Sequence, residues 1–532
     1  MPDTDTEQRT RVLITGAGPA VLVLACELAR RGVAHRLIDK DPRHFAGARG
    51  KGLQPRTQEV FEDLGVLDRA RALGGPYPAI RAHRGDQVVW EGRMDEEREP
   101  TPDVPYPNAW MLPQWRTGEI LRERLAELGS AVELGTELLS FTQDADGVTA
   151  VVRRDGQEQR IRADYLVGAD GGHSTVRRAL GVGFAGETRE EQRMVIADVR
   201  AEGVDADREF WHVWPREDPG LAMFPLALCP LAGTDAFQLM RPVLAGEQAP
   251  EPTLPELQRV LDEAAGPGRV RLTEVLWSSL FRANIRMAER FRVGRVFLAG
   301  DAAHIHSPAG GQGLNTSVQD AYNLGWKLAA VTAGAPAGLL DSYEEERLPV
   351  AAGVLGISTR LHDKGVAGDA DAHRRDDPEL HQLGLGYRDS PLSREERSAV
   401  GAVRAGDRAP DAPGSGPQGE PVRLFELFAG PHATLLAFGP EAARSAEGLA
   451  GRDGLRTVAV LAPDAPDAVP DDLYVFTDAG SNARAAYGPD AGMLLIRPDG
   501  YLGLALDPGA RSADRIRDYL AALSAVAVPA GH

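Results

Sequence analysis

Three short glycine-rich segments, far apart in the chain, constrain the fold most. They are Gly16-Ala17-Gly18-Pro19, Gly168-Ala169-Asp170-Gly171-Gly172 and Gly300-Asp301-Ala302-Ala303-His304. Each follows an apolar run that is typical of a buried strand. A glycine turn between a strand and a helix exposes backbone N–H groups and the positive end of the helix dipole, which together bind phosphate. The three segments therefore predict parts of one nucleotide site.

The first segment lies in a strand–helix–strand pattern. Residues 11–15 form an apolar run, residues 19–31 have helical spacing, and residues 34–39 read as a second strand. This order is typical of the start of a parallel sheet. Gly16 permits the tight turn, and Asp39 ends the second strand, where a carboxylate can accept a hydrogen bond from a ribose hydroxyl. Val21 stands where this motif normally has its third glycine.

The other two segments favour a flavin nucleotide. Asp170 closes one strand, and Asp301 closes another, where its carboxylate can bind ribityl hydroxyls. The run from Gly310 to Asn315 offers several backbone N–H groups with little steric cover. Such donors stabilise the negative charge that a reduced flavin carries on its pyrimidine edge.

Composition excludes several other classes of protein. The chain has 532 residues, 43% of them hydrophobic and 26% charged, as in soluble proteins of more than one domain. Its net charge of −19 argues against a nucleic-acid or anionic-membrane surface. The apolar stretch Val12 to Ala25 is too short to span a membrane, and we expect no secretion signal. Cys26 and Cys229 cannot form a CxxC pair, so we expect a cytoplasmic protein.

The domain organisation follows from changes in pattern. Residues 186–280 contain short apolar runs broken by Gly, Pro and Asp, which predict an inserted antiparallel sheet. Residues 364–422 have few large apolar side chains and predict a linker. We therefore expect a discontinuous nucleotide domain (1–185 and 281–400), a substrate-binding β-sheet domain (186–280) and a small C-terminal α/β domain (401–532).

Longer motifs resemble a known family. GADGGHSTVR at 168–177, GDAAHIHSPAGGQGLN at 300–315 and KGLQPRTQEVF at 51–61 are similar to the signatures of class A flavoprotein monooxygenases, the p-hydroxybenzoate-hydroxylase-like family. RAGDRAPDAP at 404–413 and LLIRPDGYLGLAL at 494–506 resemble the C-terminal thioredoxin-like domain of the phenol hydroxylase and aromatic polyketide hydroxylase branch.

The resemblance implies a fold. It is an α/β protein with a Rossmann-like FAD-binding domain, an inserted antiparallel-sheet substrate domain and a C-terminal thioredoxin-like domain. Because neither cysteine lies in the C-terminal stretch, that domain lacks thioredoxin chemistry. It is expected to be structural or to support a homodimer.

The resemblance also implies site residues. Asp170 would serve both FAD and NADPH, and Arg49 and Pro308 would lie beside the reactive ring as the catalytic residues. His173 occupies a position that the family usually fills with arginine. The residues that would bind FAD are Gly16, Gly18, Pro19, Ala20, Asp39, Lys40, Arg49, Gln114, Leu138, Asp170, Gly171, Asp301, Pro308, Gly311, Gln312, Gly313, Leu314 and Asn315.

The reaction that the resemblance implies is oxygen transfer. NADPH would reduce the flavin, O2 would add at its C4a atom, and the hydroperoxide would hydroxylate a polycyclic aromatic substrate of the polyketide type, as in antibiotic biosynthesis. Two alternatives stay open. One is Baeyer–Villiger oxidation of a polyketide ketone, and the other is a flavin-bound ligand-binding protein without oxygenase turnover.

Aromatic and histidine residues allow two interpretations each. Trp211, Trp214 and Phe224 either face an aromatic substrate or pack in the core of the inserted sheet. Asp301, His304 and His306 could bind iron, but their spacing is not that of the usual facial triad. We therefore expect no metal and interpret His304 as a packed, hydrogen-bonded residue near the flavin.

Overall fold

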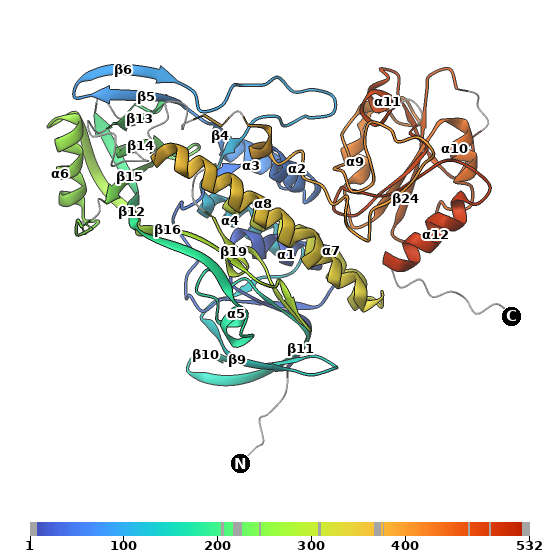
Figure 1. The fold of residues 1–532 in the computed structure, drawn as a ribbon, viewed down its shortest axis with the longest axis horizontal. Helices are drawn as coiled ribbons and strands as arrows, with labels where there is room; N and C mark the ends of the chain where they lie inside the picture. The colour runs from blue at the N-terminus through green and yellow to red at the C-terminus, as the bar shows by residue number, and fades with distance from the viewer. Residues whose placement is uncertain are drawn as a thin grey trace, which may run out of the picture.

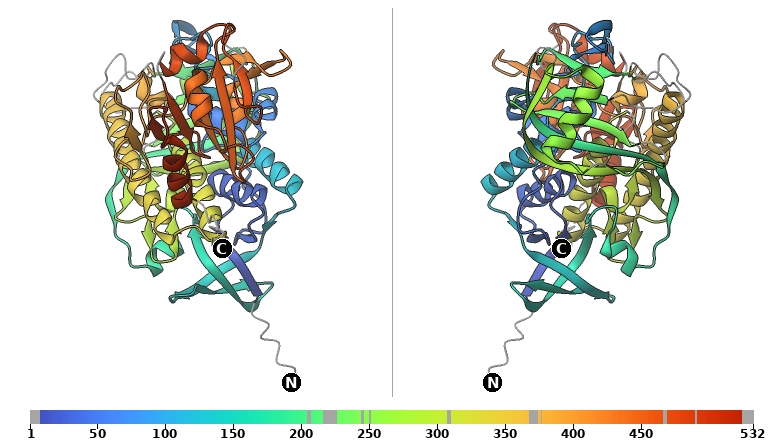
Figure 2. Two further views of the ribbon diagram at one scale, coloured as in Figure 1. Left: turned by 90° about the vertical axis from the view of Figure 1, so that its right-hand side faces the viewer. Right: turned by 90° about the vertical axis from the view of Figure 1, so that its left-hand side faces the viewer.

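The computed structural model describes residues 8–203, 207–215, 226–243, 246–249, 251–306, 310–366, 374–375, 377–465, 469–488 and 491–523. These residues form three sheets of eight strands each, two of which lie around a shared set of helices (Figure 1). The third sheet lies to the right in Figure 1, and in the left view of Figure 2 it faces the viewer.

The first sheet contains the predicted strand–helix–strand start. Five neighbouring strands, in the order β8-β2-β1-β11-β18, are parallel. Val12, Leu13 and Ile14 on β1 are fully buried, as expected for a parallel strand covered on both faces. The strands are β1 (Gln8–Thr15), β2 (His35–Ile38), β8 (Val132–Glu133), β9 (Thr136–Gln143), β10 (Val148–Arg154), β11 (Gln157–Gly168), β17 (Arg292–Val293) and β18 (Val296–Leu298).

The register of this sheet brings the three glycine segments together. Thr15 at the end of β1 pairs with Gly168 at the end of β11, and Gly168 pairs with Leu298 at the end of β18. Because parallel strands end at the same edge, the residues that follow them lie side by side. The prediction of one shared site at this edge therefore has a direct structural basis.

Helices cover the first sheet. α1 (Pro19–Arg30) packs on α7 (Gly313–Thr332), and a Cβ at Gly325 would lie 2.5 Å from Cβ of Glu27. The two helices therefore come close to each other at Gly325 on α7. Val21, which stands at the third glycine position of the motif on α1, is instead buried in the core with 2% exposure. The other helices of this part are α2 (Pro55–Asp63), α3 (Leu67–Leu73), α4 (Gln114–Glu127), α5 (Thr175–Ala179) and α8 (Asp341–Val366), with 3-10 turns at Gly300–Ala302, Ala337–Leu340 and Pro378–His381.

The second sheet is mainly antiparallel, in the order β19-β16-β12-β15-β14-β13-β5-β6. Helix α6 (Leu254–Ala265) packs on one of its faces around Val195, Leu239 and Leu261. The strands are β5 (Ala79–Arg84), β6 (Gln87–Gly92), β12 (Phe184–Gly203), β13 (Phe210–Trp214), β14 (Leu226–Pro230), β15 (Phe237–Val243), β16 (Val270–Ala288) and β19 (His304–Ile305).

This sheet draws on more of the chain than residues 186–280. Strands β5 and β6 come from a hairpin about a hundred residues earlier, and β5 joins the sheet through parallel pairing with β13. A pairing between such distant segments leaves no local signal in the sequence. A small sheet in the order β3 (Gly52–Leu53), β7 (Trp110–Met111), β4 (Gly75–Pro76) is built from segments that precede and follow this hairpin in the chain.

The third sheet has the order β20-β27-β26-β23-β24-β25-β21-β22. Its strands are β20 (Arg394–Glu396), β21 (Pro413–Ser415), β22 (Pro421–Arg423), β23 (Ala433–Phe438), β24 (Leu455–Leu461), β25 (Tyr474–Thr477), β26 (Met493–Ile496) and β27 (Leu502–Leu506). Its helices are α9 (Leu424–Phe428), α10 (Gly439–Ser445), α11 (Asn482–Tyr487) and α12 (Ser512–Leu523).

The described part of the expected linker, from residue 377 onward, is packed rather than extended. Tyr387, Ala405, Ala409 and Ala412 are buried. A Cβ at Gly406 would lie 2.6 Å from the backbone of Arg388, so glycine permits two chain segments to touch here. Small residues in this stretch serve close packing, which composition alone does not distinguish from a linker.

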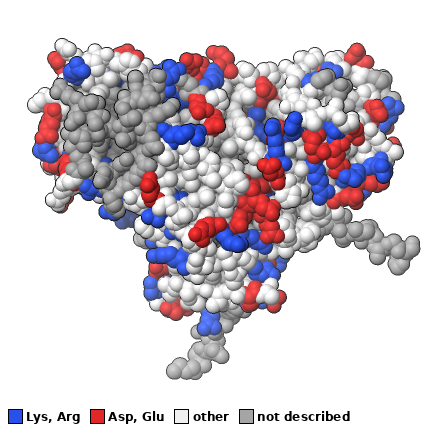
Figure 3. Space-filling model, viewed as in Figure 1, with Lys and Arg blue, Asp and Glu red and all other residues white. Residues whose placement is uncertain are grey.

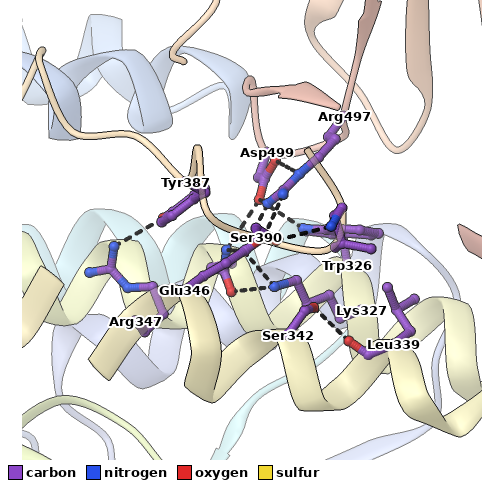
Figure 4. Close-up of polar contacts among 12 residues, drawn as sticks. Trp326, Lys327, Leu339, Ser342, Glu346, Arg347, Tyr387, Ser390, Arg497 and Asp499 are labelled. Carbon is purple, nitrogen blue, oxygen red and sulfur yellow. Dashed lines mark hydrogen bonds and ion pairs between the residues drawn. The ribbon is translucent and has the colours of Figure 1, made fainter. Parts of the chain in front are cut away.

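A buried ionic cluster joins the third sheet to helices α7 and α8 (Figure 4). Glu346 accepts hydrogen bonds from Lys327 at 2.6 Å and from Arg497 at 2.6 Å, and all three side chains are fully buried. Asp499 accepts from Arg497 and from the indole N–H of Trp326 at 3.0 Å. Since each charge meets an opposite charge, removing one partner would leave a buried charge unpaired between the two parts.

The surface shows no strong segregation of charge on the face seen in Figure 3. Acidic and basic side chains alternate over the described part of this face. Of the helices among the described residues, none combines the length and the apolar character needed to cross a membrane.

Candidate functional site

A cavity of about 910 Å³ lies between the carboxyl edge of the first sheet and one face of the second sheet. The first sheet contributes the three glycine segments. The second sheet contributes an apolar wall from four different strands. This wall consists of Met194, Ile196, Trp211, Met240 and Phe281.

Nearly all of the predicted FAD residues line this cavity. They come from eight separate places in the chain, so their convergence is a property of the fold. The lining residues among them are Gly16, Gly18, Pro19, Ala20, Asp39, Lys40, Arg49, Gln114, Leu138, Asp170, Gly171, Asp301, Gly311, Gln312, Gly313 and Leu314. Pro308 lies outside the described residues.

The glycines leave room for a ligand. Gly16 has φ +107°, and a Cβ there would lie 2.3 Å from the carbonyl oxygen of Ala169, so only glycine fits this turn. At Gly18 and Gly313, in contrast, a Cβ would meet no described atom within 4 Å. These positions adjoin the N-termini of α1 and α7, which begin at Pro19 and Gly313. Open space before two helix N-termini fits the phosphates and the electron-rich ring edge of FAD.

Two carboxylates face the same space. Burial raises the pKa of Asp39, which accepts a hydrogen bond from the backbone N–H of Asp41 at 2.8 Å. Asp301 is open to the cavity but enclosed by protein on its other sides, and this enclosure raises the pKa of its carboxyl, against the opposing effects of His304 and Arg49. Both positions suit acceptors for sugar or ribityl hydroxyls.

Other predicted residues hold the site in place. Asp170 accepts from the backbone N–H of Thr175 at 2.6 Å and from the Ser174 hydroxyl, so its carboxylate caps α5. Asn315 does not line the cavity. Its side chain accepts from the Gln54 N–H at 2.8 Å and donates to the carbonyl of Gly311 at 2.9 Å. It therefore fixes the start of α7 against the segment at residues 52–54.

Arg49 and Gln114 occupy neighbouring stretches of the cavity wall. The guanidinium of Arg49 lies 5.3 Å from the ring centre of Phe45 and 5.9 Å from that of Trp277. Gln114 accepts from the backbone N–H of Gly50 at 3.0 Å, which fixes the chain just after Arg49. A catalytic role for Arg49 stays a prediction.

The three residues predicted to face the substrate do not lie together in the structure. Trp211 lines the cavity, whereas Trp214 is buried on the opposite face of the sheet, where it stacks on His83 at 5.2 Å between ring centres. Side chains alternate along a strand, so two residues three positions apart on β13 point to opposite faces. The packing interpretation therefore describes Trp214. Phe224 lies outside the described residues.

His304 is packed and hydrogen-bonded, as the sequence predicts. Its Nε2 lies 2.6 Å from the Asp320 carboxylate, and its Nδ1 lies 2.8 Å from Nε2 of His306. Asp320 also accepts from Arg347 at 2.8 Å; burial would raise the pKa of Asp320, but His304 and Arg347 hold it below its usual range. No three His, Cys, Asp or Glu side chains of the described chain are grouped so as to hold a metal ion.

Sequence reasoning missed a polar group on the wall of the second sheet. Lys51 lines the cavity and donates to Gln238 at 2.6 Å, and Asp198 is the direct cross-strand partner of Gln238. Lys51 is the first residue of the motif at 51–61, but Gln238 and Asp198 come from strands far along the chain. No local spacing links these three residues.

The comparisons with known proteins agree with this geometry. The family model described as "FAD binding domain" matches residues 9–358. A flavin-dependent monooxygenase of Mycobacteroides abscessus is 46% identical over 502 residues, which cover 94% of this chain and 97% of that protein. Pentachlorophenol 4-monooxygenase of Sphingobium chlorophenolicum is 32% identical, with 92% and 93% covered. The crystal structure of aklavinone-11 hydroxylase with FAD and aklavinone superposes with a TM-score of 0.80 at 29% identity, covering 97% of this chain and 99% of that one.

Proposed function

Because this chain belongs to the FAD-binding family of class A flavoprotein monooxygenases, we propose that it consumes NADPH and inserts one oxygen atom from O2 into a polycyclic aromatic substrate of the polyketide type. Hydroxylation is the proposed outcome. The observation that carries the proposal is a single cavity, in which the glycine and acid segments of the first sheet face an aromatic and methionine wall on the second.

The residues present fit FAD. We propose that Gly16, Gly18 and the start of α1 bind its pyrophosphate, that Asp39 binds the adenosine ribose and that Asp301 binds the ribityl chain. The backbone N–H groups of Gly311 to Leu314 are the proposed donors to the pyrimidine edge. When bound, the flavin supplies redox chemistry and oxygen activation, and the protein supplies position and a dry pocket.

The apolar wall supports an aromatic substrate. Met194, Ile196 and Met240 present flat, adaptable apolar surface, and Trp211 adds an aromatic face. A cavity of about 910 Å³ is at the upper end of the usual range for ligand pockets, about 300–1,000 Å³. The names of the relatives, which include a chlorophenol and a polycyclic aklavinone enzyme, support the same class of substrate.

Three further assignments are part of the proposal. The order β27-β26-β23-β24, with parallel β23 and β24 and an antiparallel β26–β27 hairpin, supports a thioredoxin-like C-terminal domain beginning near residue 401. We propose that this domain is structural or supports a homodimer. Two buried, unpaired cysteines support a cytoplasmic location.

The test is turnover by the FAD-loaded enzyme against a panel of polycyclic phenols and quinones. We expect NADPH oxidation that requires both FAD and substrate, and one labelled atom in the product under ¹⁸O2. NMR of the product skeleton separates hydroxylation from ring expansion. Absence of substrate-dependent NADPH oxidation across the panel would contradict the proposal.

A further inference from the structure

Lys51 is a cation beside the wall that the second sheet contributes to the cavity. The lining side chains that come from β12, β13, β15 and β16 are Met194, Ile196, Trp211, Gln238, Met240 and Phe281, and none of them carries a charge. The ammonium of Lys51 lies 4.4 Å from the centre of the Trp211 ring, so it stands over an aromatic face of this wall. A charge in an otherwise apolar wall needs a partner or a purpose.

The position of this ammonium is fixed from behind. Gln238 donates its side-chain N–H to the carbonyl of Ala48, which turns its oxygen toward Lys51, and this oxygen accepts from the ammonium at 2.6 Å. The N–H of Ala48 donates to Asp198 at 2.9 Å. Asp198 and Gln238 are direct partners across β12 and β15, and each is 2% exposed. The carboxyl of Asp198 therefore lies beside Gln238 on the same face of the sheet, buried under the segment at Ala48, whereas Lys51 itself lines the cavity.

The ammonium retains a free donor. A lysine ammonium has three N–H groups. One donates to Gln238, and the ammonium also opposes the rise in pKa that burial causes at the thiol of the fully buried Cys229. Among the described residues, Gln238 supplies the one oxygen that accepts from this ammonium, so a further N–H remains for a ligand. This donor, beside the Trp211 ring, can meet a charged oxygen on an aromatic ring that packs against the wall.

We infer that Lys51 determines specificity by binding an ionised hydroxyl, a phenolate or enolate oxygen, of the aromatic substrate. This inference rests on the proposed function and names its substrate class more closely. An ionised oxygen releases electron density into its ring, which favours attack on an electrophilic oxygen. Binding the anion against Lys51 thus selects the hydroxylated ring and prepares it for oxygen transfer.

The test uses binding to the FAD-loaded enzyme without NADPH. The probe is 1,2-dihydroxyanthraquinone, whose visible absorption moves to longer wavelength when a hydroxyl ionises, at a pH where the free probe is neutral. Its dimethyl ether is the matched compound that cannot ionise. Affinity and the spectrum of the bound probe are measured for wild type, Lys51→Met and Lys51→Arg. Arg154→Met, an exposed residue on β10 that is not part of the cavity wall, is the control for loss of a cation.

We expect the wild type to shift the probe to the ionised spectrum. Lys51→Met should lose the shift and weaken probe binding roughly 10- to 100-fold, the worth of a hydrogen bond to a charged group. Lys51→Arg should keep the shift in part, Arg154→Met should keep it fully, and affinity for the dimethyl ether should change less than about twofold in all variants.

Several results would overturn the inference. These are an unshifted probe on the wild type, no binding of either compound, an intact shift in Lys51→Met, or equal weakening of both compounds. Failure of the proposed function would give a different result. In that case the ionised probe binds through Lys51, but no substrate supports NADPH oxidation.

Discussion

The first sheet and its helices meet two neighbours in opposite ways. Toward the second sheet they leave a cavity of about 910 Å³, and carboxylates such as Asp301 face open space. Toward the third sheet, in contrast, the carboxylate of Glu346 is paired with the cations of Lys327 and Arg497. On the open side Asp301 is placed to meet a ligand, whereas on the sealed side Glu346 is neutralised by protein cations.

The largest expected effect comes from breaking the sealed contact. Glu346→Ala leaves Lys327 and Arg497 as buried cations without their shared carboxylate. Removing one partner of a buried ion pair costs about 3–5 kcal/mol. We expect the free energy of unfolding in urea to fall by this amount. Glu345→Ala, an exposed neighbour on α8, is the control and should change it by less than about 0.5 kcal/mol. Equal stability of the two variants would show that the cluster does not join the parts.

On the open side, Gly16→Ala should act on the cofactor. The new Cβ would lie 2.3 Å from the Ala169 oxygen at a φ of +107°, at a cost of up to about 3 kcal/mol in the site. We expect the purified variant to lose most of its bound FAD, measured by absorbance. Gly32→Ala is the matched control, because Gly32 also has a positive φ (+68°) but has no described atom near its Cβ position. Normal FAD content in Gly16→Ala would contradict the assigned pyrophosphate site.

A smaller effect is expected at Asp198, which is buried beside Gln238 on the substrate face of the second sheet. Burial raises the pKa of this carboxyl to about 6, although the Ala48 N–H and Lys51 oppose the shift. The folded state therefore holds the proton more tightly than the unfolded state, and this stabilisation is lost as the pH rises from about 4 through 6. Asp198→Asn should remove this dependence. Its stability relative to wild type should increase by about 2–3 kcal/mol between pH 4 and pH 7.5, measured by thermal unfolding. A constant difference across this range would contradict the raised pKa.

The smallest expected effect is a difference in ligand affinity between substitutions on the two faces of the second sheet. Trp211→Ala should weaken binding of a hydroxyanthraquinone about tenfold, since Trp211 faces the cavity and an aromatic contact is worth about 0.5–1.5 kcal/mol. Trp214→Ala should leave affinity within about twofold and lower stability instead, because Trp214 packs beneath α6. Similar losses of affinity in both variants would place the substrate elsewhere.

The sequence predicted the flavin end of the cavity better than the substrate end. The flavin end is made of backbone turns and strand-end acids, and these leave local motifs such as Gly16–Pro19 and Gly300–Asp301. The substrate end is made of side chains on strands that pair over long distances. Thus the hairpin of β5 and β6 and the Lys51–Gln238–Asp198 group left no local signal. Trp211 and Trp214 looked equivalent until the register of β13 assigned them to different faces.

The most direct test of the account is a crystal structure of the enzyme with FAD and 1,2-dihydroxyanthraquinone. We expect the pyrophosphate at Gly16 and Gly18, the ribityl chain at Asp301, and the anthraquinone against Trp211 with one oxygen at Lys51, all within one cavity. FAD bound away from the three glycine segments, or an anthraquinone bound outside the wall of the second sheet, would contradict it.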